Sequence, residues 1–189
     1  SELSYGAASM ALESAGLRRS DIDCCVLGTA PDAFDGIHMN GEYLAAGAGG
    51  AGLPTLRGYV GGGTGVFSVI QGWYMVASGV FDVCMVLCEE KMSPCQPHPQ
   101  GAFLTIFDHT TERPLQPNLL WIFALEMNRY MSTYGISKRD IAPVAVKNKG
   151  NALDHPCAQL GAKLTVDDVL ESEVMAWPVN RLDVSPTSD

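Results

Sequence analysis

Five residues of the chain have the composition of a turn that holds a reacting group. Three consecutive glycines, Gly61–Gly63, are followed by Thr64 and Gly65, and they join an apolar, β-prone segment to an apolar segment long enough for a buried helix. Where a strand turns sharply into a helix, backbone N–H groups and the positive end of the helix dipole point at whatever lies above the turn. The pattern therefore predicts a site where a polarised group passes too close for side chains.

Three chemistries use that geometry, and the residue types distinguish them. A phosphate-binding loop requires Gly-Lys-Ser/Thr, but Val66 follows Gly65 here. A dinucleotide turn requires Gly-x-Gly-x-x-Gly, and counting from Gly61 or Gly63 the last position holds Val66 or Ser68. The third chemistry is a nucleophile elbow, in which a Ser or Cys at the turn is activated by the helix end and neighbouring groups form an oxyanion hole.

Six surrounding segments have the patterns of the elements that must position this turn. The predicted helices are 2–16, 37–48 and 64–78, and the predicted strands are 22–30, 56–60 and 81–90. Helices and strands alternate with short connections, and the strands carry no polar face. This order is typical of an α/β fold in which a mostly parallel sheet is covered by helices on both faces.

The later part of the chain departs from this alternation. Proline and glycine break the pattern after the third strand, so we expect a loop excursion at about 92–135, closing with a helix that ends at Gly135. A Thr-x-x-Asp pattern at 165–168 is typical of a capped helix start. The last residues read as a polar turn where another buried strand would be expected. We therefore expect the last strand, or a whole second lobe, to lie outside this chain.

Composition excludes several classes of function. Hydrophobic residues make up 47% of the chain and charged residues 17%, the profile of a compact α/β protein. The net charge of −9 comes without a basic cluster, so nucleic acid is not an expected partner. No apolar run reaches the roughly 18 residues that span a bilayer, and the N-terminus lacks the layout of a signal peptide. We expect a cytoplasmic protein.

Most of the six cysteines have the surroundings of small buried hydrophobic residues in a reducing compartment. Cys24 and Cys25 are neighbours in one predicted strand, and Cys84 and Cys88 belong to another, so we expect all four to be buried in the sheet. A metal site at Cys84, Cys88 and Cys95 is disfavoured, because the spacing does not match a zinc knuckle and two of these residues lie in a strand.

The segment 61–93 resembles the nucleophile region of thiolases, in which a Cys-x-Ser/Thr-Gly turn opens a buried helix and a strand then ends in Glu-Lys-Met-Ser. Aligning Thr64 and Gly65 on the Ser/Thr-Gly pair puts Gly62 where the catalytic cysteine belongs. The segment 129–159 resembles sterol-carrier-type thiolases through its Tyr-Gly, Lys-Asn and Asn-Ala landmarks. The resemblance covers nearly the whole chain. It implies a thiolase-like layered α/β fold of two similar halves, of which this chain is the N-terminal half.

The resemblance also implies a protein that acts on acyl-CoA thioesters, with coenzyme A thioester as substrate and no bound cofactor. Thiolase-like retro-aldolases of steroid side-chain degradation lack the cysteine, cleave a β-hydroxyacyl-CoA by deprotonating its hydroxyl, and work with a small OB-fold partner. Lyase chemistry of this kind suits Gly62 best. Two alternatives stay open: an acetyl-CoA acetyltransferase-like enzyme with a displaced nucleophile, and a non-catalytic scaffold subunit of a CoA-dependent complex.

Under this resemblance no catalytic side chain is intact in the chain. Gly62 marks the vacant nucleophile position, and Gly63, Thr64 and Gly65 are candidates for a turn that stabilises an oxyanion. Three residues are candidates for substrate contacts: Tyr59, Met92 and His98. The second half, which in thiolases carries the catalytic His motif and a second cysteine, would supply the remaining groups.

The resemblance implies partners as well. In thiolases the strand before the nucleophile turn pairs with its twofold mate, so we expect a homodimer through an edge strand at Leu56–Val60. A small OB-fold acyl-CoA-binding subunit is a further expected partner. Several aromatic side chains are expected in the core and at interfaces: Trp73, Tyr74, Trp121, Phe123 and Tyr130.

Overall fold

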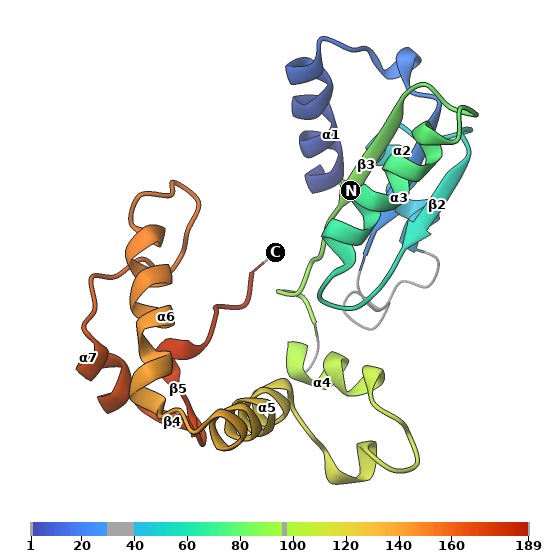
Figure 1. The fold of residues 1–189 in the computed structure, drawn as a ribbon. Helices are drawn as coiled ribbons and strands as arrows, with labels where there is room; N and C mark the ends of the chain where they lie inside the picture. Colours follow the sequence, from blue (N-terminus) through green and yellow to red (C-terminus); the bar gives the residue numbers. More distant parts are fainter. Residues whose placement is uncertain (1, 30–39, 96–97, 189) are drawn as a thin grey trace. The chain divides into compact units, whose positions relative to one another are not determined.

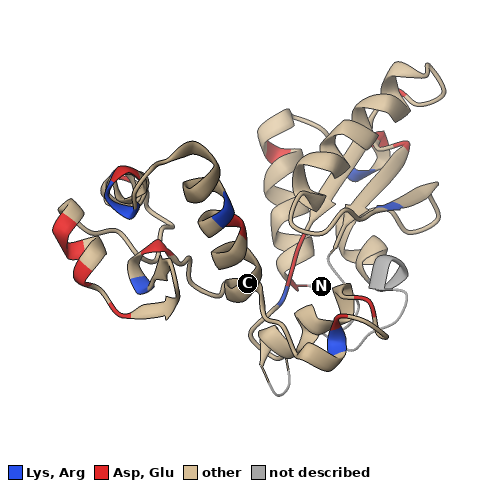
Figure 2. Ribbon diagram, turned by 60° about the horizontal axis from the view of Figure 1, so that its bottom comes forward, with Lys and Arg blue, Asp and Glu red and all other residues tan. Residues whose placement is uncertain are grey.

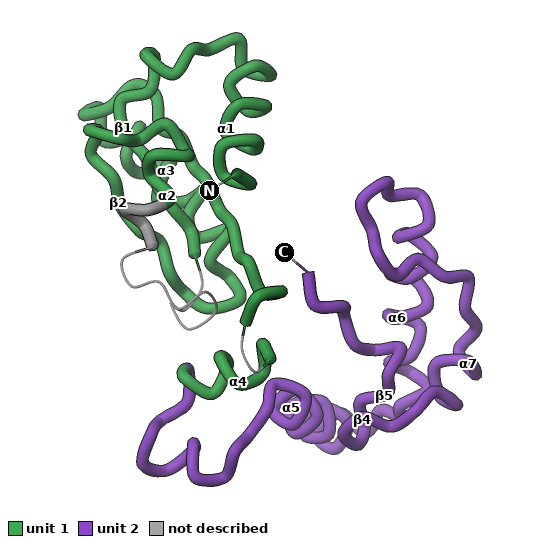
Figure 3. The backbone as a smooth tube through the Cα atoms, turned by 180° about the vertical axis from the view of Figure 1, so that it is seen from behind, with its two compact units in different colours: residues 1–105, 189 green, residues 106–188 purple. Residues whose placement is uncertain are grey.

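The computed structural model describes residues 2–29, 40–95 and 98–188. The chain divides into two compact units, residues 1–105 and 106–188 (Figure 3). Acidic positions outnumber basic ones along the ribbon, and the basic ones are dispersed (Figure 2). None of the helices in the described residues combines the length and the apolar composition required to cross a membrane.

The first unit is built on a sheet of three parallel strands (Figure 1). These are β1 (Cys24–Gly28), β2 (Thr55–Gly58) and β3 (Cys84–Cys88), arranged in the order β2-β1-β3. β1 is completely buried and pairs with both neighbours, Cys25 opposite Thr55 and Cys24 opposite Cys84. The predicted α/β architecture with a parallel, helix-covered sheet is confirmed, and β2 lies at an edge of this sheet as expected.

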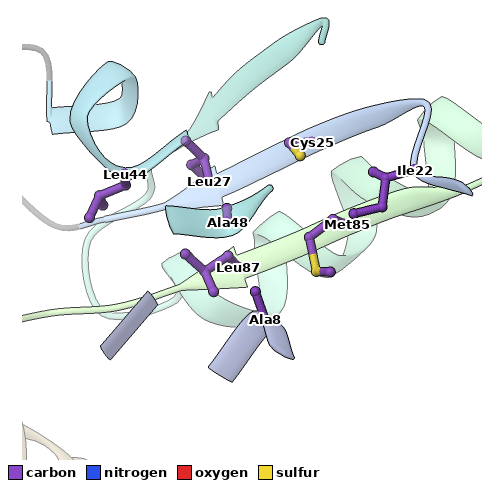
Figure 4. Close-up of a cluster of buried hydrophobic side chains, with 8 residues drawn as sticks. All are labelled: Ala8, Ile22, Cys25, Leu27, Leu44, Ala48, Met85 and Leu87. Atoms are coloured by element: carbon purple, nitrogen blue, oxygen red, sulfur yellow. The ribbon is translucent and has the colours of Figure 1, made fainter. Parts of the chain in front are cut away.

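One face of the sheet packs against α1 (Glu2–Ala15) and α2 (Asn40–Ala48). Side chains alternate along a strand, so every second residue of β1 and β3 points to this face. Together with residues of the two helices and the loop before β1, they form the main core (Figure 4): Ala8, Ile22, Cys25, Leu27, Leu44, Ala48, Met85 and Leu87. Gly16 follows α1 with φ +66°, as predicted for a helix terminator. Residues 37–39 of the predicted second helix lie outside the described residues.

The opposite face of the sheet packs against α3 (Thr64–Ala77). Ser68 and Gly72 of α3 are buried at this contact. Because both residues are small, the helix backbone can approach the strands closely. The chain carries no charged residue from Gly58 to Phe81, so the outward side of α3 is apolar too. Val66 and Trp73 on that side are 72% and 63% exposed. α3 is thus hydrophobic all round, although only one side of it is covered within this chain.

The segment predicted as an excursion contains several short elements. α4 (Pro99–Phe103) belongs to the first unit, and two 3-10 turns follow it, η2 (Leu104–Ile106) and η3 (Arg113–Leu115). A further 3-10 turn, η1 (Arg19–Asp21), precedes β1. α4 and η3 each have a proline among their first two residues, where its fixed φ favours a helix start: Pro99 and Pro114.

The second unit consists of three helices and a small hairpin. The helices are α5 (Leu119–Tyr134), α6 (Lys138–Ala152) and α7 (Val166–Glu171). Each begins at a suitable residue: the side chain of Asn118 caps α5, and Ser137 and Thr165 form capping boxes with acidic residues three positions on. α5 ends at Gly135 with φ +65°, as predicted.

A hairpin closes the second unit, and the sequence pattern did not predict it. β4 (Val174–Ala176) pairs antiparallel with β5 (Val179–Asn180), and a 3-10 turn follows, η4 (Arg181–Asp183). The buried amide of Asn180 donates to the carbonyls of Leu170 and Ser172 at 3.1 and 2.7 Å. The buried Lys138 ammonium pairs with Asp183, which ties α6 to η4.

Candidate active site

The glycine turn lies where the carboxyl ends of the three parallel strands meet the start of α3. A Cβ built on Gly28, the last residue of β1, would lie 2.5 Å from Ser68 Oγ and 2.7 Å from Cys88 Sγ. The Cys88 thiol lies 3.8 Å from the carbonyl oxygen of Gly65. β1, β3 and α3 therefore converge on one small region. Ligands of open α/β sheets bind at this end of the strands.

The turn itself is held by backbone conformation and by one side chain. Gly61 has φ +65°, a value that L-residues rarely adopt. The hydroxyl of Thr64 donates to the carbonyl of Gly61 at 2.6 Å and accepts the N–H of Val60 at 3.1 Å. Thr64 is buried, and its own N–H also donates to Gly61 O at 3.1 Å. The residues from Val60 to Thr64 thus form a closed, hydrogen-bonded turn.

The start of α3 leaves backbone donors unused. Gly63 precedes the helix and has no side chain with which to cap it, and Phe67 N–H donates to Gly63 O at 3.0 Å. The N–H groups of Gly65 and Val66 find no backbone acceptor in the described part of the chain. Such donors, together with the helix dipole, can polarise a carbonyl or hold an oxyanion.

The space above the turn is open. A Cβ built on Gly62 or Gly65 would meet no atom within 4 Å, and neither residue has a positive φ. Packing within the described residues therefore does not explain why these positions are glycine. A group from outside this part of the chain would explain it, either a ligand or another polypeptide.

The remaining predicted contact residues fall into two places. Tyr59 directly follows β2 and is 47% exposed, beside the turn in sequence. Met92 packs against a separate small cluster made by Cys95 and Ala102. His98 caps α4, and its Nδ1 accepts the N–H of Gly101 at 3.2 Å. Met92 and His98 thus have local structural roles around α4, and their contact with substrate stays a prediction.

The expectation that Cys88 is buried in the sheet is wrong. Cys24 and Cys25 are completely buried and Cys84 is partly buried, but Cys88 is exposed. Cys88 is the last residue of β3, and its thiol lies beside the first turn of α3. Burial raises the pKa of the Cys84 thiol to about 12, with a further contribution from its hydrogen bond to Cys24. Cys84 and Cys88, four residues apart, therefore differ in accessibility.

Two polar residues support this region without a sequence signal that would have revealed them. Ser4 of α1 is buried, and its hydroxyl donates to the carboxylate of Glu89, which directly follows β3. The N–H of Glu89 donates to Gly28 O at 3.1 Å. The Ser4–Glu89 bond joins residues 85 positions apart in the chain. The Glu89–Gly28 bond holds the end of β3 beside the end of β1. Within the described residues, no group of three or more His, Cys, Asp or Glu side chains could hold a metal ion.

A cleft of about 550 Å³ lies in the second unit, between α5 and α6. Its lining combines apolar side chains such as Phe123 and Ile141 with the acidic Glu126 and Asp140. Carboxylates at the rim disfavour the phosphates of coenzyme A. Phe123 is exposed here, as are the other aromatic residues expected in the core and at interfaces, Trp73, Tyr74, Trp121 and Tyr130. None of the five lies in the core of this chain, and their place at an interface stays a prediction.

Comparison with known proteins gives a consistent result. The family model described as the thiolase N-terminal domain matches residues 1–164. The chain is 30% identical over 183 residues to an acetyl-CoA acetyltransferase of Methanothermobacter thermautotrophicus, covering 95% of this chain and 47% of that protein. It is 29% identical over 180 residues to an acetyl-CoA acetyltransferase of Methanocaldococcus jannaschii, covering 95% and 46%.

A solved structure is similar as well. The Ltp2-ChsH2(DUF35) aldolase superposes with a TM-score of 0.60 and 27% identity, covering 92% of this chain and 44% of that chain. The chain thus spans about half the length of the relatives that it matches.

Proposed function

Since this chain belongs to the thiolase family through its N-terminal domain, we propose that it is the N-terminal half of an enzyme that acts on acyl-CoA thioesters. The reaction that we propose is carbon–carbon bond cleavage of a β-hydroxyacyl-CoA by a retro-aldol step, without a cysteine nucleophile. Coenzyme A thioester would be the substrate, and no further cofactor is required by this chemistry.

The observation that carries this proposal is Gly62. The residue lies in a turn with free N–H donors and open space above it, but it offers no nucleophilic atom. Acyl transfer through a covalent acyl-enzyme requires such an atom. A retro-aldol step requires only that negative charge on the thioester oxygen be stabilised, and the turn at the start of α3 is suited to that role.

The proposed step balances without an oxidant or reductant. A base removes the proton of the β-hydroxyl, the oxygen forms a carbonyl, and the bond between Cα and Cβ breaks. The bonding pair passes to the thioester as an enolate, whose oxygen would accept hydrogen bonds from the N–H groups of Gly65 and Val66. Protonation of Cα then releases a shorter acyl-CoA and an aldehyde or ketone. We assign the base to no residue of this chain.

The similarity to a solved aldolase supports this proposal, because the name of that structure couples Ltp2 with a ChsH2(DUF35) component. We propose that this chain works with a small OB-fold acyl-CoA-binding subunit, and that its substrate derives from lipid or steroid side chains. All six cysteines are free thiols, which agrees with the reducing cytoplasm that we propose as its location.

We also propose that the second half of the fold covers the outward side of α3. Four of its exposed apolar residues follow a spacing of three and four, which is the pattern of a helix-packing seam: Val66, Val69, Trp73 and Val76. Exposed apolar surface of this extent is typical of an interface. The length of the relatives, about twice that of this chain, would supply the covering layer.

The edge strand β2 supports the proposed homodimer. Leu56 and Val60, in and just after β2, are about half exposed, and β2 pairs on one side only within the described sheet. A strand edge without a partner is prone to pair with another strand. A twofold mate would close the sheet through this edge.

One observation favours a second candidate function, acyl transfer by a displaced nucleophile. The exposed Cys88 thiol lies at the same end of the sheet as the vacant position, 3.8 Å from Gly65 O. The matched relatives from Methanothermobacter and Methanocaldococcus carry the name acetyl-CoA acetyltransferase. In this alternative, Cys88 would form the acyl-enzyme in place of the missing cysteine.

Incubation with two thioesters in turn separates the two reactions. The chain, assembled with the polypeptide that supplies its second half, is mixed with 3-hydroxybutyryl-CoA, and products and protein mass are followed. Retro-aldol cleavage gives acetyl-CoA and acetaldehyde in equal amounts and leaves every cysteine unmodified. With acetyl-CoA as the probe, an acetyl group on Cys88 that disappears in Cys88→Ser would instead establish acyl transfer. The absence of turnover with both thioesters would indicate a scaffold.

A further inference from the structure

We propose that Thr64 is a positioning residue, whose hydroxyl fastens the glycine turn so that the backbone donors at the start of α3 keep a fixed direction. The hydroxyl does not cap the helix, because Thr64 is its first residue rather than the residue before it. Instead it accepts the N–H of Val60 and donates to the carbonyl of Gly61. One buried oxygen therefore joins both sides of the turn.

The need for a fastening follows from the composition of the turn. Glycine loses more backbone freedom on ordering than any other residue, and Gly61–Gly63 are consecutive. Cβ atoms built on Gly61 and Gly62 would meet nothing within 4 Å, so no side-chain packing holds these two residues. Hydrogen bonds are then the means of ordering them, and Thr64 provides three: two through its hydroxyl and one through its N–H.

Thr64 is also connected to the sheet, through its backbone carbonyl. Ser68, one helical turn further along α3, is completely buried, and its hydroxyl donates to the carbonyl of Thr64 at 2.8 Å. Cβ atoms built on Gly28 and Gly58 would lie 2.5 and 2.6 Å from Ser68 Oγ. The ends of β1 and β2 therefore press against Ser68. The direction of the free N–H groups is in this way tied to the rigid part of the first unit.

The proposal rests on the proposed function only where it concerns ligand binding, and the experiment separates the two. The full chain is labelled with ¹⁵N, and hydrogen exchange of the amides at positions 64 and 67, which donate to Gly61 O and Gly63 O, is compared in Thr64→Val and Thr64→Ser after correction for their intrinsic rates. Valine keeps the shape of threonine without its hydroxyl, whereas serine keeps the hydroxyl. Thr55→Val is the matched control, because it removes a 3.1 Å hydroxyl bond to Leu53 O at the other end of β2.

We expect Thr64→Val to speed exchange of the amides at positions 64 and 67 by about fivefold or more, the effect of losing roughly one net hydrogen bond. Gly28 in the buried β1 should keep its exchange rate, Thr64→Ser should restore the parent behaviour, and Thr55→Val should leave the turn unchanged. Equal exchange in Thr64→Val and the parent would overturn the proposal. So would faster exchange of Gly28 in parallel with the turn, because the hydroxyl would then stabilise the whole unit.

The second arm measures the affinity of the same samples for 3-hydroxybutyryl-CoA by calorimetry. We expect Thr64→Val to bind about five- to tenfold more weakly than Thr64→Ser. If the turn loosens but the parent does not bind the thioester, the proposed function fails for the chain by itself while the role of Thr64 stands. If the turn loosens and affinity is unchanged, Thr64 does not position the binding groups, and the proposal is refuted.

Discussion

Two glycines, Gly72 within α3 and Gly62 in the turn before it, differ in what surrounds them. On the sheet-facing side, a Cβ built on Gly72 would lie closer to Val86 Cγ2 than van der Waals contact allows, and Cys84 Sγ would lie 3.4 Å away. At the N-terminal turn, a Cβ on Gly62 would meet nothing within 4 Å. Gly72 is therefore required by packing inside the chain, and Gly62 is not.

This difference teaches how to separate structural from functional glycine. A glycine at a close contact between two elements is required by packing, because any side chain there would push the elements apart. A glycine with open space and an ordinary φ, such as Gly62, is not explained by packing within the described residues. The two cysteines of β3 follow the same division: Cys84 lies beside Gly72, and Cys88 lies beside Gly65.

The largest effect is expected at the sheet-facing side. Gly72→Ala should lower the free energy of unfolding by about 1–2 kcal/mol, because overpacking against the stiff Val86 costs roughly 1–3 kcal/mol and outweighs a gain in helix propensity of up to about 1 kcal/mol. Urea unfolding of the full chain measures this change.

Gly6→Ala is the matched control, because Gly6 lies within α1 with no atom near its Cβ position. It should raise the free energy of unfolding by about 0.5–1 kcal/mol, because only the higher helix propensity of alanine contributes. Changes of equal sign in the two variants would show that packing does not distinguish these glycines.

The next effect concerns the turn. Gly62→Ala should change the free energy of unfolding by no more than about 1 kcal/mol, since its conformation is accessible to alanine. In the complete assembly it should weaken binding or turnover of 3-hydroxybutyryl-CoA about tenfold, because a methyl group occupies the space needed by the thioester. Calorimetry and product formation provide the measurements. Parent-like affinity and turnover would remove the reason to place substrate above this turn.

A smaller effect is expected one residue earlier. Gly61 has φ +65°, so Gly61→Ala should lower the free energy of unfolding by about 1 kcal/mol through backbone strain alone. Gly79→Ala is the control, because Gly79 has φ +73° and also has open space around it. It should show a similar loss of stability without an effect on thioester binding. A stable Gly61→Ala variant would mean that the turn tolerates another conformation.

The smallest effect on the fold is expected from the two thiols. Iodoacetamide at pH 8 should modify the exposed Cys88 and leave Cys84 unmodified, since burial keeps the Cys84 thiol protonated. Peptide mapping by mass spectrometry identifies the modified residue. Equal labelling of both thiols in the folded protein would contradict the difference in burial.

The raised pKa of the Cys84 thiol predicts a pH dependence of stability. Cys84 has a pKa of about 12 in the folded protein, above its ordinary value of 9.0. The folded protein then keeps a proton that the unfolded chain releases, so this contribution to stability is complete below pH 9 and is lost as the pH rises toward 12. Cys84→Ala should flatten the decline in urea midpoint across this range. An unchanged slope would assign the decline to other groups.

Much of the first unit could be predicted from local patterns. The strand and helix around the glycine turn were expected at 56–60 and 64–78, and the structure has Thr55–Gly58 and Thr64–Ala77. The hairpin after α7 was missed, because strands of three and two residues are too short to show an alternating pattern. The exposure of Cys88 was missed because an apolar run does not reveal where the covering helix begins.

The sequence by itself determined the order of elements, the glycine turn and the absence of a nucleophile at position 62, because each depends on residue type and local spacing. Only the tertiary structure decided which glycines touch other atoms, that Ser4 reaches Glu89, and that Cys88 lies beside the start of α3. These facts depend on how distant segments approach one another. Such approaches are set by the sum of many weak contacts in the packed core, which no single stretch of sequence displays.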